Sequence, residues 1–339
     1  MKRADEPRRI LVTGGAGFIG SHLVERLLAQ GALVTVVDDF STGRRQNLAA
    51  VHDADRLTII DSTVSAAIDG GSLPAFTEIY HLAAAVGVRL ILERPIQTIE
   101  TNILETASVL RFAAKDDTPI LIASSSEVYG KSTATPFAEE DDVVYGPTSK
   151  TRWSYACTKA IDEYLALAHS REETLPAVIV RFFNTVGPRQ VGDYGMVLPL
   201  FVRAALEHEP LRVFGDGSQV RCFCDVREVV EVLPKLLRTP GAYGRVFNLG
   251  RDEPISIHDL ARRVIETLDS RSSIEFVPYE NAYQPGFEDL MARVPDIGRI
   301  RETVGFEPKM SLEQTILDIA ESLGRITAVE TECGDGRSC

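Results

Sequence analysis

A glycine pattern near the N-terminus constrains the fold of this chain more than any other feature. Gly14, Gly17 and Gly20 follow the apolar run Ile10–Thr13 and precede a stretch with helical periodicity. Gly14 permits a tight turn, Gly17 lets the backbone approach a pyrophosphate, and Gly20 allows close packing of the helix on the strand. The helix N-terminus then presents N–H groups to the phosphates. The pattern therefore predicts a dinucleotide-binding unit at the start of the fold.

Apolar runs rich in Val, Ile and Leu continue through the first half of the chain. The expected strands are Ile10–Thr13, Leu33–Val37, Leu57–Ile60, Ile79–Leu82, Ile120–Ala123 and Val178–Phe182. Between them lie amphipathic stretches, of which the clearest are Gly17–Gln30, Ile96–Ala114 and Trp153–Ser170. Continuous apolar strands alternating with helices are typical of a parallel sheet covered on both faces. We therefore predict an α/β fold with a Rossmann-type, doubly wound parallel sheet.

The pattern loosens after Phe183. Helices are expected at Val197–Glu207, Ile257–Leu268 and Leu312–Leu323. The strands Cys222–Val226 and Val246–Leu249 are expected to rejoin the main sheet or its edge. We predict a smaller, interleaved C-terminal domain that binds substrate over the carboxyl edge of the sheet. Residues 1–185 and about 222–250 would form the dinucleotide-binding domain, about 186–221 and 251–325 the substrate domain, and 326–339 a flexible tail.

Composition argues against several classes of protein. The chain has 36 Lys and Arg against 49 Asp and Glu, a net charge of −13, which disfavours general affinity for nucleic acid. No apolar run approaches the roughly 18 residues that cross a bilayer, and the charged N-terminus is a poor signal peptide. The five cysteines have no zinc-binding spacing and are expected to be reduced thiols. We expect a cytoplasmic protein without a bound metal or a membrane partner.

Asp38 indicates which dinucleotide is bound. It ends the second expected strand, where a carboxylate accepts hydrogen bonds from the adenosine ribose and repels a 2′-phosphate. This favours NAD over NADP. Asp61, at the end of the third strand, is placed either to reach the adenine or simply to end the strand. The expected cofactor-binding residues are Gly14, Gly17, Phe18, Ile19, Gly20, Asp38, Asp61, Leu82, Tyr155 and Lys159.

A tyrosine and a lysine four residues apart are the candidate redox centre. Tyr155 and Lys159 share one face of an expected helix. A phenol with a pKa near 10 is a poor base at neutral pH, but a nearby ammonium and the positive nicotinamide lower that pKa. The segment Ser124–Gly130 follows an expected strand and so lies at the carboxyl edge of the sheet, where ligands bind. We expect Ser125 to share the reacting hydroxyl of the substrate with Tyr155.

As an ordered set, these motifs resemble the extended short-chain dehydrogenase/reductase family of sugar-nucleotide epimerases, dehydratases and decarboxylases. The matching segments are GGAGFIGSHL, VVDDFSTG, YHLAA, SSSEVYG, YACTK and RFFNTVGPR. The resemblance extends from about Arg9 to Leu323. It implies that Tyr155 takes the proton of the sugar 4-hydroxyl while C4 passes hydride to NAD. It also implies that Lys159 holds the ribose of the cofactor and tunes Tyr155.

The residues after Ser125 distinguish branches of this family. The TDP-glucose dehydratases carry an acid directly after the active-site hydroxyl, whereas this chain has Ser126 and then Glu127. That order resembles UDP-glucuronate decarboxylases and also GDP-mannose 4,6-dehydratases, which normally use NADP. The segment Tyr283–Asp296 is similar to the late arginine–proline segment of UDP-glucuronate decarboxylases. The resemblance therefore implies catalytic roles for Glu127 and Arg293.

The chemistry of decarboxylation suits this pair. Oxidation of a glucuronate at C4 makes a β-keto acid, and CO₂ leaves because the 4-ketone accepts the electrons as an enolate. Arg293 can bind the carboxylate or stabilise the enolate, and Glu127 can help handle the proton at C5. Returning hydride from NADH gives UDP-xylose, whereas failure to return it releases the 4-keto pentose.

Other readings stay open. The apolar loop Ala83–Val88 is closer to epimerases, and Ala292 stands where many decarboxylases have a second arginine, so a 4-epimerase or 4,6-dehydratase is the main alternative. A non-catalytic NAD-binding regulator is another. The family implies a homodimer formed through the helices Ile96–Ala114 and Trp153–Ser170. We expect Val213 and Phe214 to lie beside the uridine and Arg221 to bind the diphosphate. The other expected substrate contacts are Ser126, Asn184, Arg189 and Arg293.

Overall fold

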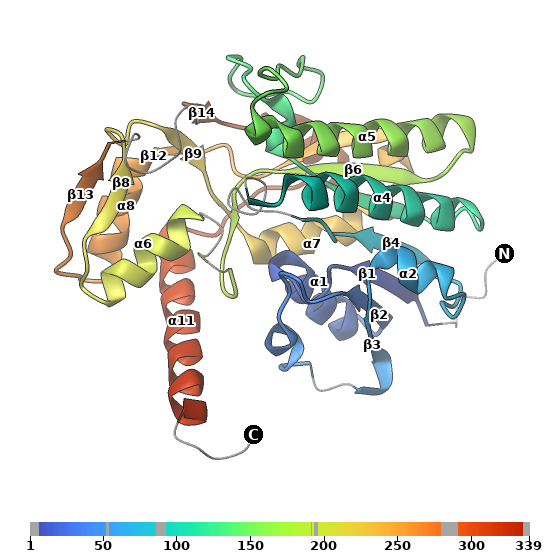
Figure 1. Ribbon diagram of the computed structural model, residues 1–339, viewed down its shortest axis with the longest axis horizontal. Helices are drawn as coiled ribbons and strands as arrows, with labels where there is room; N and C mark the ends of the chain where they lie inside the picture. Colours follow the sequence, from blue (N-terminus) through green and yellow to red (C-terminus); the bar gives the residue numbers. More distant parts are fainter. Residues whose placement is uncertain are drawn as a thin grey trace.

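A parallel sheet of seven strands forms the centre of the structure, a computed structural model that describes residues 7–51, 54–85, 93–190, 192, 196–278 and 291–334 (Figure 1). The strands lie in the order β11-β6-β5-β4-β1-β2-β3. Their bounds are β1 Arg9–Thr13, β2 Leu33–Asp38, β3 Leu57–Asp61, β4 Glu78–His81, β5 Ile120–Ser125, β6 Ala177–Phe182 and β11 Arg245–Leu249. Every pairing between neighbours is parallel. The chain therefore winds outward in both directions from β1.

Helices cover both faces of this sheet, because its apolar strands present side chains alternately to each side. One core packs α1 (Phe18–Ala29), α7 (Val226–Leu237) and α10 (Gly298–Val304) against the sheet. The other core packs α2 (Val64–Asp69), α4 (Pro95–Ala114) and α5 (Ser154–Glu172) against the opposite face. Figure 1 shows the two layers. The predicted Rossmann-type, doubly wound sheet is confirmed.

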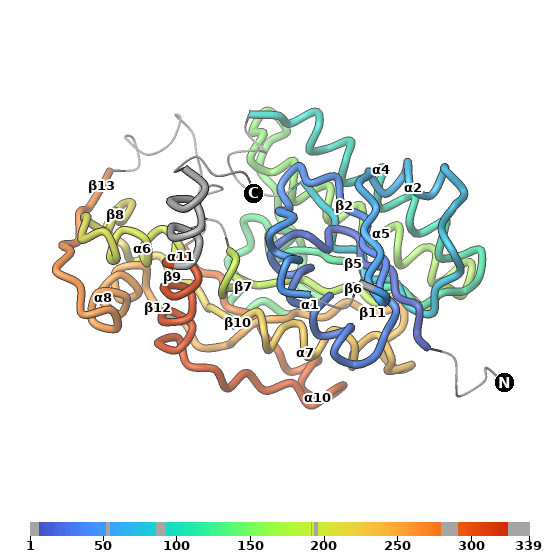
Figure 2. The backbone as a smooth tube through the Cα atoms, turned by 90° about the horizontal axis from the view of Figure 1, so that it is seen from below, coloured from blue at the N-terminus to red at the C-terminus, as the bar shows by residue number. Residues whose placement is uncertain are grey.

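A separate apolar core lies beyond the carboxyl edge of the sheet and unites α6 (Val197–Leu206), α8 (Ile257–Thr267) and α11 (Leu312–Gly334). Figure 2 shows α6 and α8 beside β8 and β13 at one end of the molecule, far from α2 and α4. The small strands pair as β8 (Leu211–Phe214) with β13 (Ile274–Val277), and as β12 (Pro254–Ser256), β9 (Val220–Cys222) and β14 (Ala292–Arg293). The proposed domain boundaries and the tail from residue 326 stay predictions, although α11 continues to Gly334.

One of the two late strands was misplaced by the sequence pattern. Val246–Leu249 rejoins the main sheet as predicted, within β11. The expectation for Cys222–Val226 is wrong: Cys222 belongs to the small sheet of β9, and Cys224–Asp225 (β10) pairs with Thr185–Val186 (β7). The strand cannot continue because the Asp225 side chain accepts a hydrogen bond from the Arg227 backbone N–H and caps α7.

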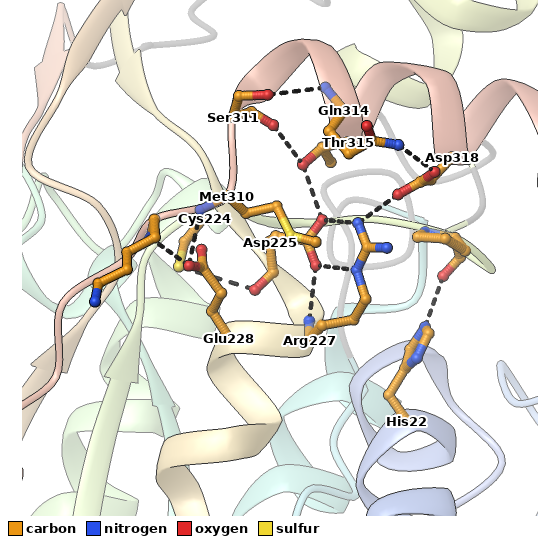
Figure 3. A network of polar contacts seen from close by, with 12 residues as sticks. His22, Cys224, Asp225, Arg227, Glu228, Met310, Ser311, Gln314, Thr315 and Asp318 are labelled. Atoms are coloured by element: carbon orange, nitrogen blue, oxygen red, sulfur yellow. Dashed lines mark hydrogen bonds and ion pairs between the residues drawn. The ribbon is translucent and has the colours of Figure 1, made fainter.

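A polar junction joins α7, on the main sheet, to α11, on the second core (Figure 3). The Arg227 guanidinium contacts Asp225 at 2.7 Å and Asp318 at 2.6 Å. Thr315 donates a hydrogen bond to Asp225 at 2.8 Å. The hydrogen bonds to Asp225 outweigh its burial and lower the pKa of its carboxyl. This charged contact fixes how the second core sits on the carboxyl edge of the sheet.

The described residues also include short 3₁₀ turns at Arg45–Leu48, Ala54–Arg56, Ser126–Tyr129, Thr151–Trp153 and Pro240–Ala242. Among the described helices, none is both long enough and apolar enough to cross a membrane.

Candidate active site

The glycine turn after β1 is shaped as a close-packed cradle. Gly14 has a φ of +70°, and a Cβ there would lie 2.7 Å from the backbone nitrogen of Ala83. A Cβ on Gly20 would lie 2.1 Å from the carbonyl oxygen of Gly14. Gly17 sits directly before the first residue of α1. Side chains at positions 14 and 20 would therefore collide with the chain's own backbone, so the tight turn that leads into the N-terminus of α1 requires glycine at both.

Asp38 lies against this cradle. Its carboxylate accepts hydrogen bonds from the backbone N–H groups of Ala16, at 2.8 Å, and Phe40, at 2.9 Å. Burial is the largest influence and raises the pKa of Asp38, while these two bonds act against it. Asp61 contacts Arg45, whose guanidinium lies 4.0 Å from the centre of the Phe40 ring. Asp38 thus faces the glycine turn, whereas Asp61 stands at the outer rim.

We expect Asp38→Asn to weaken NADH binding about tenfold and to reduce the preference for NADH over NADPH. The charged acceptor is lost, and so is its repulsion of a 2′-phosphate. Fluorescence titration with both reduced cofactors measures the two effects. Asp39→Asn is the matched control, because the Asp39 carboxylate is exposed and bonds only to Ser41 among the contacts of the described residues. Equal losses for NADH and NADPH would contradict the assignment of Asp38 to the ribose.

Ser125 and Tyr155 meet at the carboxyl edge of the sheet. Ser125 ends β5, and its Oγ accepts a hydrogen bond from the Glu127 backbone N–H at 3.2 Å. Tyr155 is the second residue of α5 and is buried. Burial and then the Glu127 charge raise the pKa of Tyr155 well above its usual value, although a hydrogen bond with Ser125 lowers it. Tyr155 is therefore protonated in the free protein and needs further positive charge before it can act as a base.

Lys159 lies one helical turn beyond Tyr155 and is buried. Its Nζ donates a hydrogen bond to the Asp162 carboxylate at 3.0 Å. Asp162 was missed by the sequence analysis. The only signal for it was an acidic residue three positions after Lys159, on the same helical face.

Glu127 is clamped between two arginines. Its carboxylate oxygens lie 2.7 Å from Arg152 Nη1 and 2.5 Å from Arg293 Nη1. Burial acts to raise the pKa of Glu127, but Arg293 and then Arg152 overcome it and lower the pKa to about 2. The structure thus brings together Glu127 and Arg293, which the sequence singled out separately. Arg152 could not be assigned a role from its sequence position, because its only signal was its place three residues before Tyr155.

Arg293 reaches Glu127 because its short strand is held on both sides. β14 pairs in parallel with β9, which sets Arg293 opposite Arg221. On the other side, Phe137 donates its backbone N–H to the Val294 carbonyl at 2.8 Å and accepts from the Asp296 N–H at 2.8 Å. Two independent backbone pairings therefore fix the position from which the Arg293 side chain extends.

A buried polar network supports this edge from below. Arg181 binds both carboxylate oxygens of Glu163, at 2.9 and 2.7 Å, and Ser124 donates to the same carboxylate. Tyr129 donates its hydroxyl to Asn248 at 2.7 Å. These bonds connect β5, α5, β6 and β11 beneath the site, so they hold the ends of the strands in a fixed arrangement.

The other predicted substrate contacts are more scattered. Asn184 donates its side-chain N–H to the Cys222 carbonyl at 3.1 Å. Arg189 points to α1, where it contacts Glu25 at 2.6 Å and Ser21 at 3.2 Å. The remaining predicted residues are placed as follows: Ser126 is buried after β5, Val213 and Phe214 end β8, Arg221 is buried on β9, Phe18 and Ile19 open α1, and Leu82 follows β4. Their roles stay predictions.

Two segments used in the sequence analysis fall partly outside the described residues. They are residues 86–88 of the Ala83–Val88 loop and residues 283–290 of the Tyr283–Asp296 segment.

The sequence matches the family described as NAD dependent epimerase/dehydratase over residues 10–250. It is 40% identical over 312 residues to the UDP-N-acetyl-alpha-D-glucosaminuronate decarboxylase of Bacillus cytotoxicus, covering 91% of this chain and 95% of that protein. It is 38% identical over 306 residues to UDP-glucuronic acid decarboxylase 2 of Arabidopsis thaliana, covering 90% of this chain but only 66% of the plant protein.

Among solved structures, the fold is similar to that of UDP-N-acetylglucosamine 4-epimerase from Methanobrevibacter ruminantium. The TM-score is 0.85 at 26% identity, and the match covers 95% of this chain and 99% of that one. The shared architecture therefore includes the second core as well as the central sheet.

Proposed function

This chain belongs to the NAD-dependent epimerase/dehydratase family and uses NAD, and we propose that it oxidises UDP-glucuronate at C4 and releases its carboxyl group as CO₂. The observation that carries the proposal is the contact of Glu127 with Arg152 and Arg293 beside Tyr155. Two buried arginines at the reacting edge suit a substrate that bears a carboxylate. Epimerisation at C4 alone requires no such group.

The cofactor site fits NAD. Gly14 and Gly20 permit the tight turn into α1, whose N-terminal N–H groups would hold the pyrophosphate, and Asp38 lies where it can accept from the ribose hydroxyls. Bound there, NAD would accept hydride from C4 and could return it, and the nicotinamide charge would add to that of the Lys159 ammonium in lowering the high pKa of Tyr155.

Separate side chains then transfer the protons and stabilise the charges of the reaction. Tyr155 takes the proton of the 4-hydroxyl while Ser125 holds the same oxygen by a hydrogen bond. Arg293 binds the sugar carboxylate in the ground state and the enolate charge after the C5–carboxyl bond breaks. A second carboxylate on Arg293 weakens its hold on Glu127 and raises the pKa of Glu127, so that Glu127 can take up a proton from water and deliver it to C5 as the enolate returns to the ketone.

A second substrate deserves the same test, because the Bacillus cytotoxicus relative is named for the 2-acetamido form of the sugar acid and aligns over 95% of its length. The purified enzyme should be incubated with NAD and, separately, UDP-glucuronate and UDP-N-acetylglucosaminuronate. We expect CO₂ from at least one, and the ratio of kcat/KM values identifies the preferred sugar. The ratio of pentose to 4-keto pentose shows whether hydride returns. UDP-galacturonate without CO₂ would identify a 4-epimerase instead.

We also propose a homodimer formed through α4 and α5, which pack side by side on one face of the sheet (Figure 1). Large apolar side chains on these helices are exposed: Ile96 by 72%, Leu104 by 59%, Ile161 by 41% and Tyr164 by 69%. A four-helix contact would bury them. Sedimentation equilibrium at micromolar concentration should give twice the chain mass, and Leu104→Glu should give the monomer. A wild-type monomer would rule out this interface.

We infer a cytoplasmic location. The thiols of Cys157, Cys222 and Cys224 are all free, and two of them are buried. Unpaired thiols suit a reducing compartment.

A further inference from the structure

A buried acid on α5 has no part in the reaction proposed above. Asp162 is 0% exposed and contacts the Lys159 ammonium, which is also buried. Burial raises the pKa of Asp162, and Lys159 and then Thr106 lower it. One carboxylate oxygen, Oδ1, is buried without a hydrogen-bond partner. A buried ion pair with an unsatisfied oxygen contributes little to stability, so a functional reason for Asp162 is needed.

A chain of hydrogen bonds leads from the glycine turn to this acid. Burial and then Lys159 lower the pKa of His81 to about 3, so its ring is neutral and carries one N–H. Its Nδ1 lies 2.8 Å from Thr13 Oγ1, and its Nε2 lies 3.1 Å from Thr106 Oγ1. Thr13 Oγ1 also accepts from the Ala83 backbone N–H at 3.3 Å.

One orientation gives Thr13, His81 and Thr106 a consistent order of donors and acceptors, and it leaves Asp162 Oδ1 open to the remaining Thr106 proton. If Thr13 donates to Nδ1, then Nε2–H of His81 donates to Thr106, and the Thr106 proton is free for Asp162. We therefore assign the Nε2–H tautomer to His81 from the network. The series starts at Ala83, whose backbone lies against Gly14, and ends at the carboxylate that binds Lys159.

We propose that Asp162 is a positioning residue that holds the Lys159 ammonium beside Tyr155 and links it, through Thr106, His81 and Thr13, to the turn that binds the cofactor. An ammonium has three donors, so one can bind Asp162 while two remain for the cofactor ribose and the direction of Tyr155. The inference rests on the proposed function only for the assignment of Tyr155 and Lys159 as the reacting pair.

The charges around Tyr155 single out Asp162. Glu163, the next residue, is turned toward Arg181, and Glu127 is held by Arg152 and Arg293. Within the described part of the chain, Asp162 is the ionic partner of Lys159. Its negative charge also raises the pKa of Tyr155. Asp162 therefore moderates the positive charge that Lys159 presents to the tyrosine.

The test is Asp162→Asn, which keeps the shape and removes the charge. In NAD-saturated enzyme, we expect Tyr155 to titrate about one pH unit lower than in the wild type, because the Lys159 charge is no longer offset. The readout is tyrosinate absorbance, taken as the difference between each protein and the same protein carrying Tyr155→Phe. The acidic limb of the pH profile of kcat/KM should move in the same direction.

Thr158→Val is the matched control. Thr158 is buried on the same face of α5 and bonds to Asn102 and to the Tyr155 carbonyl, so its replacement disturbs packing without changing charge. It should leave the Tyr155 titration in place. An unshifted titration in Asp162→Asn, with lost activity in both variants, would overturn the proposal in favour of a packing role. Asp162→Ser replaces Asp162→Asn if the latter does not fold. Because the titration needs no sugar, it decides the role of Asp162 even if wild-type enzyme releases no CO₂.

Discussion

Tyr155→Phe will lower kcat/KM for the nucleotide sugar by about 10³-fold while the protein still binds NAD. The ring stays in the buried space that Tyr155 occupies, so only the hydroxyl is lost. Without it, Ser125 can still hold the reacting oxygen by a hydrogen bond, but a serine does not replace a tuned phenol as a base. A positioned general base typically contributes 10²–10⁴-fold, which sets the expected magnitude.

Single-turnover measurement of NADH absorbance gives the direct readout. In the variant, neither NADH nor CO₂ should form at the wild-type rate, because C4 oxidation precedes loss of the carboxyl group. Tyr243→Phe, a change of the same kind at a ring that packs against the α1/α7 core, should leave both rates unchanged. Wild-type turnover by Tyr155→Phe would remove the tyrosine from the mechanism.

Arg293→Met will reduce CO₂ release by about 10³-fold and will also destabilise the protein. The variant leaves the largely buried Glu127 carboxylate with Arg152 as its remaining arginine partner in the described structure. Breaking a buried ion pair from one side typically costs about 3 kcal/mol. The kinetic effect arises because the positive charge of Arg293 no longer binds the leaving carboxylate or stabilises the enolate.

The double variant Glu127→Gln/Arg293→Met separates these two effects. Neutral glutamine needs no counter-ion, so thermal unfolding should return most of the way to the wild-type temperature, while CO₂ release stays low. The stability gain also has a pH signature. Because the arginines hold the pKa of Glu127 at about 2, its contribution to wild-type stability is complete above pH 4.5 and is lost as the pH falls toward 2. Recovery of CO₂ release in the double variant would show that Arg293 only neutralises the buried Glu127 charge and that neither side chain is needed in the reaction.

The parts of this protein that depend on local sequence could be predicted. Gly14, Gly17 and Gly20 act within one strand–turn–helix unit, so their spacing alone indicates the cradle. Tyr155 and Lys159 are related by one helical turn. Glu127 and Arg293 could be singled out only through a family resemblance, because no local rule relates two residues so far apart in the chain. Their contact depends on β14, a two-residue strand with no periodicity to detect.

The features that the sequence predicted wrongly or missed also depend on contacts between distant parts of the chain. Cys222–Val226 has the composition of a strand, but Asp225 ends that strand as a helix cap, and the choice of pairing partner depends on distant β7. Arg152 and Asp162 carry charges that become meaningful only when their buried partners are known. Burial and ion pairing are properties of the assembled fold, so a single sequence states the residue type without its environment.

The register between β9 and β14 has a consequence for substrate selection. Arg221 and Arg293 stand opposite each other on adjacent parallel strands, so both side chains leave the same face of one small sheet. If Arg221 binds the diphosphate and Arg293 the sugar carboxylate, the spacing of these two strands sets the distance between the two anionic groups that a substrate must present. A free sugar acid or a bare nucleotide would then contact only one of the two arginines, whereas a nucleotide-linked sugar acid would contact both.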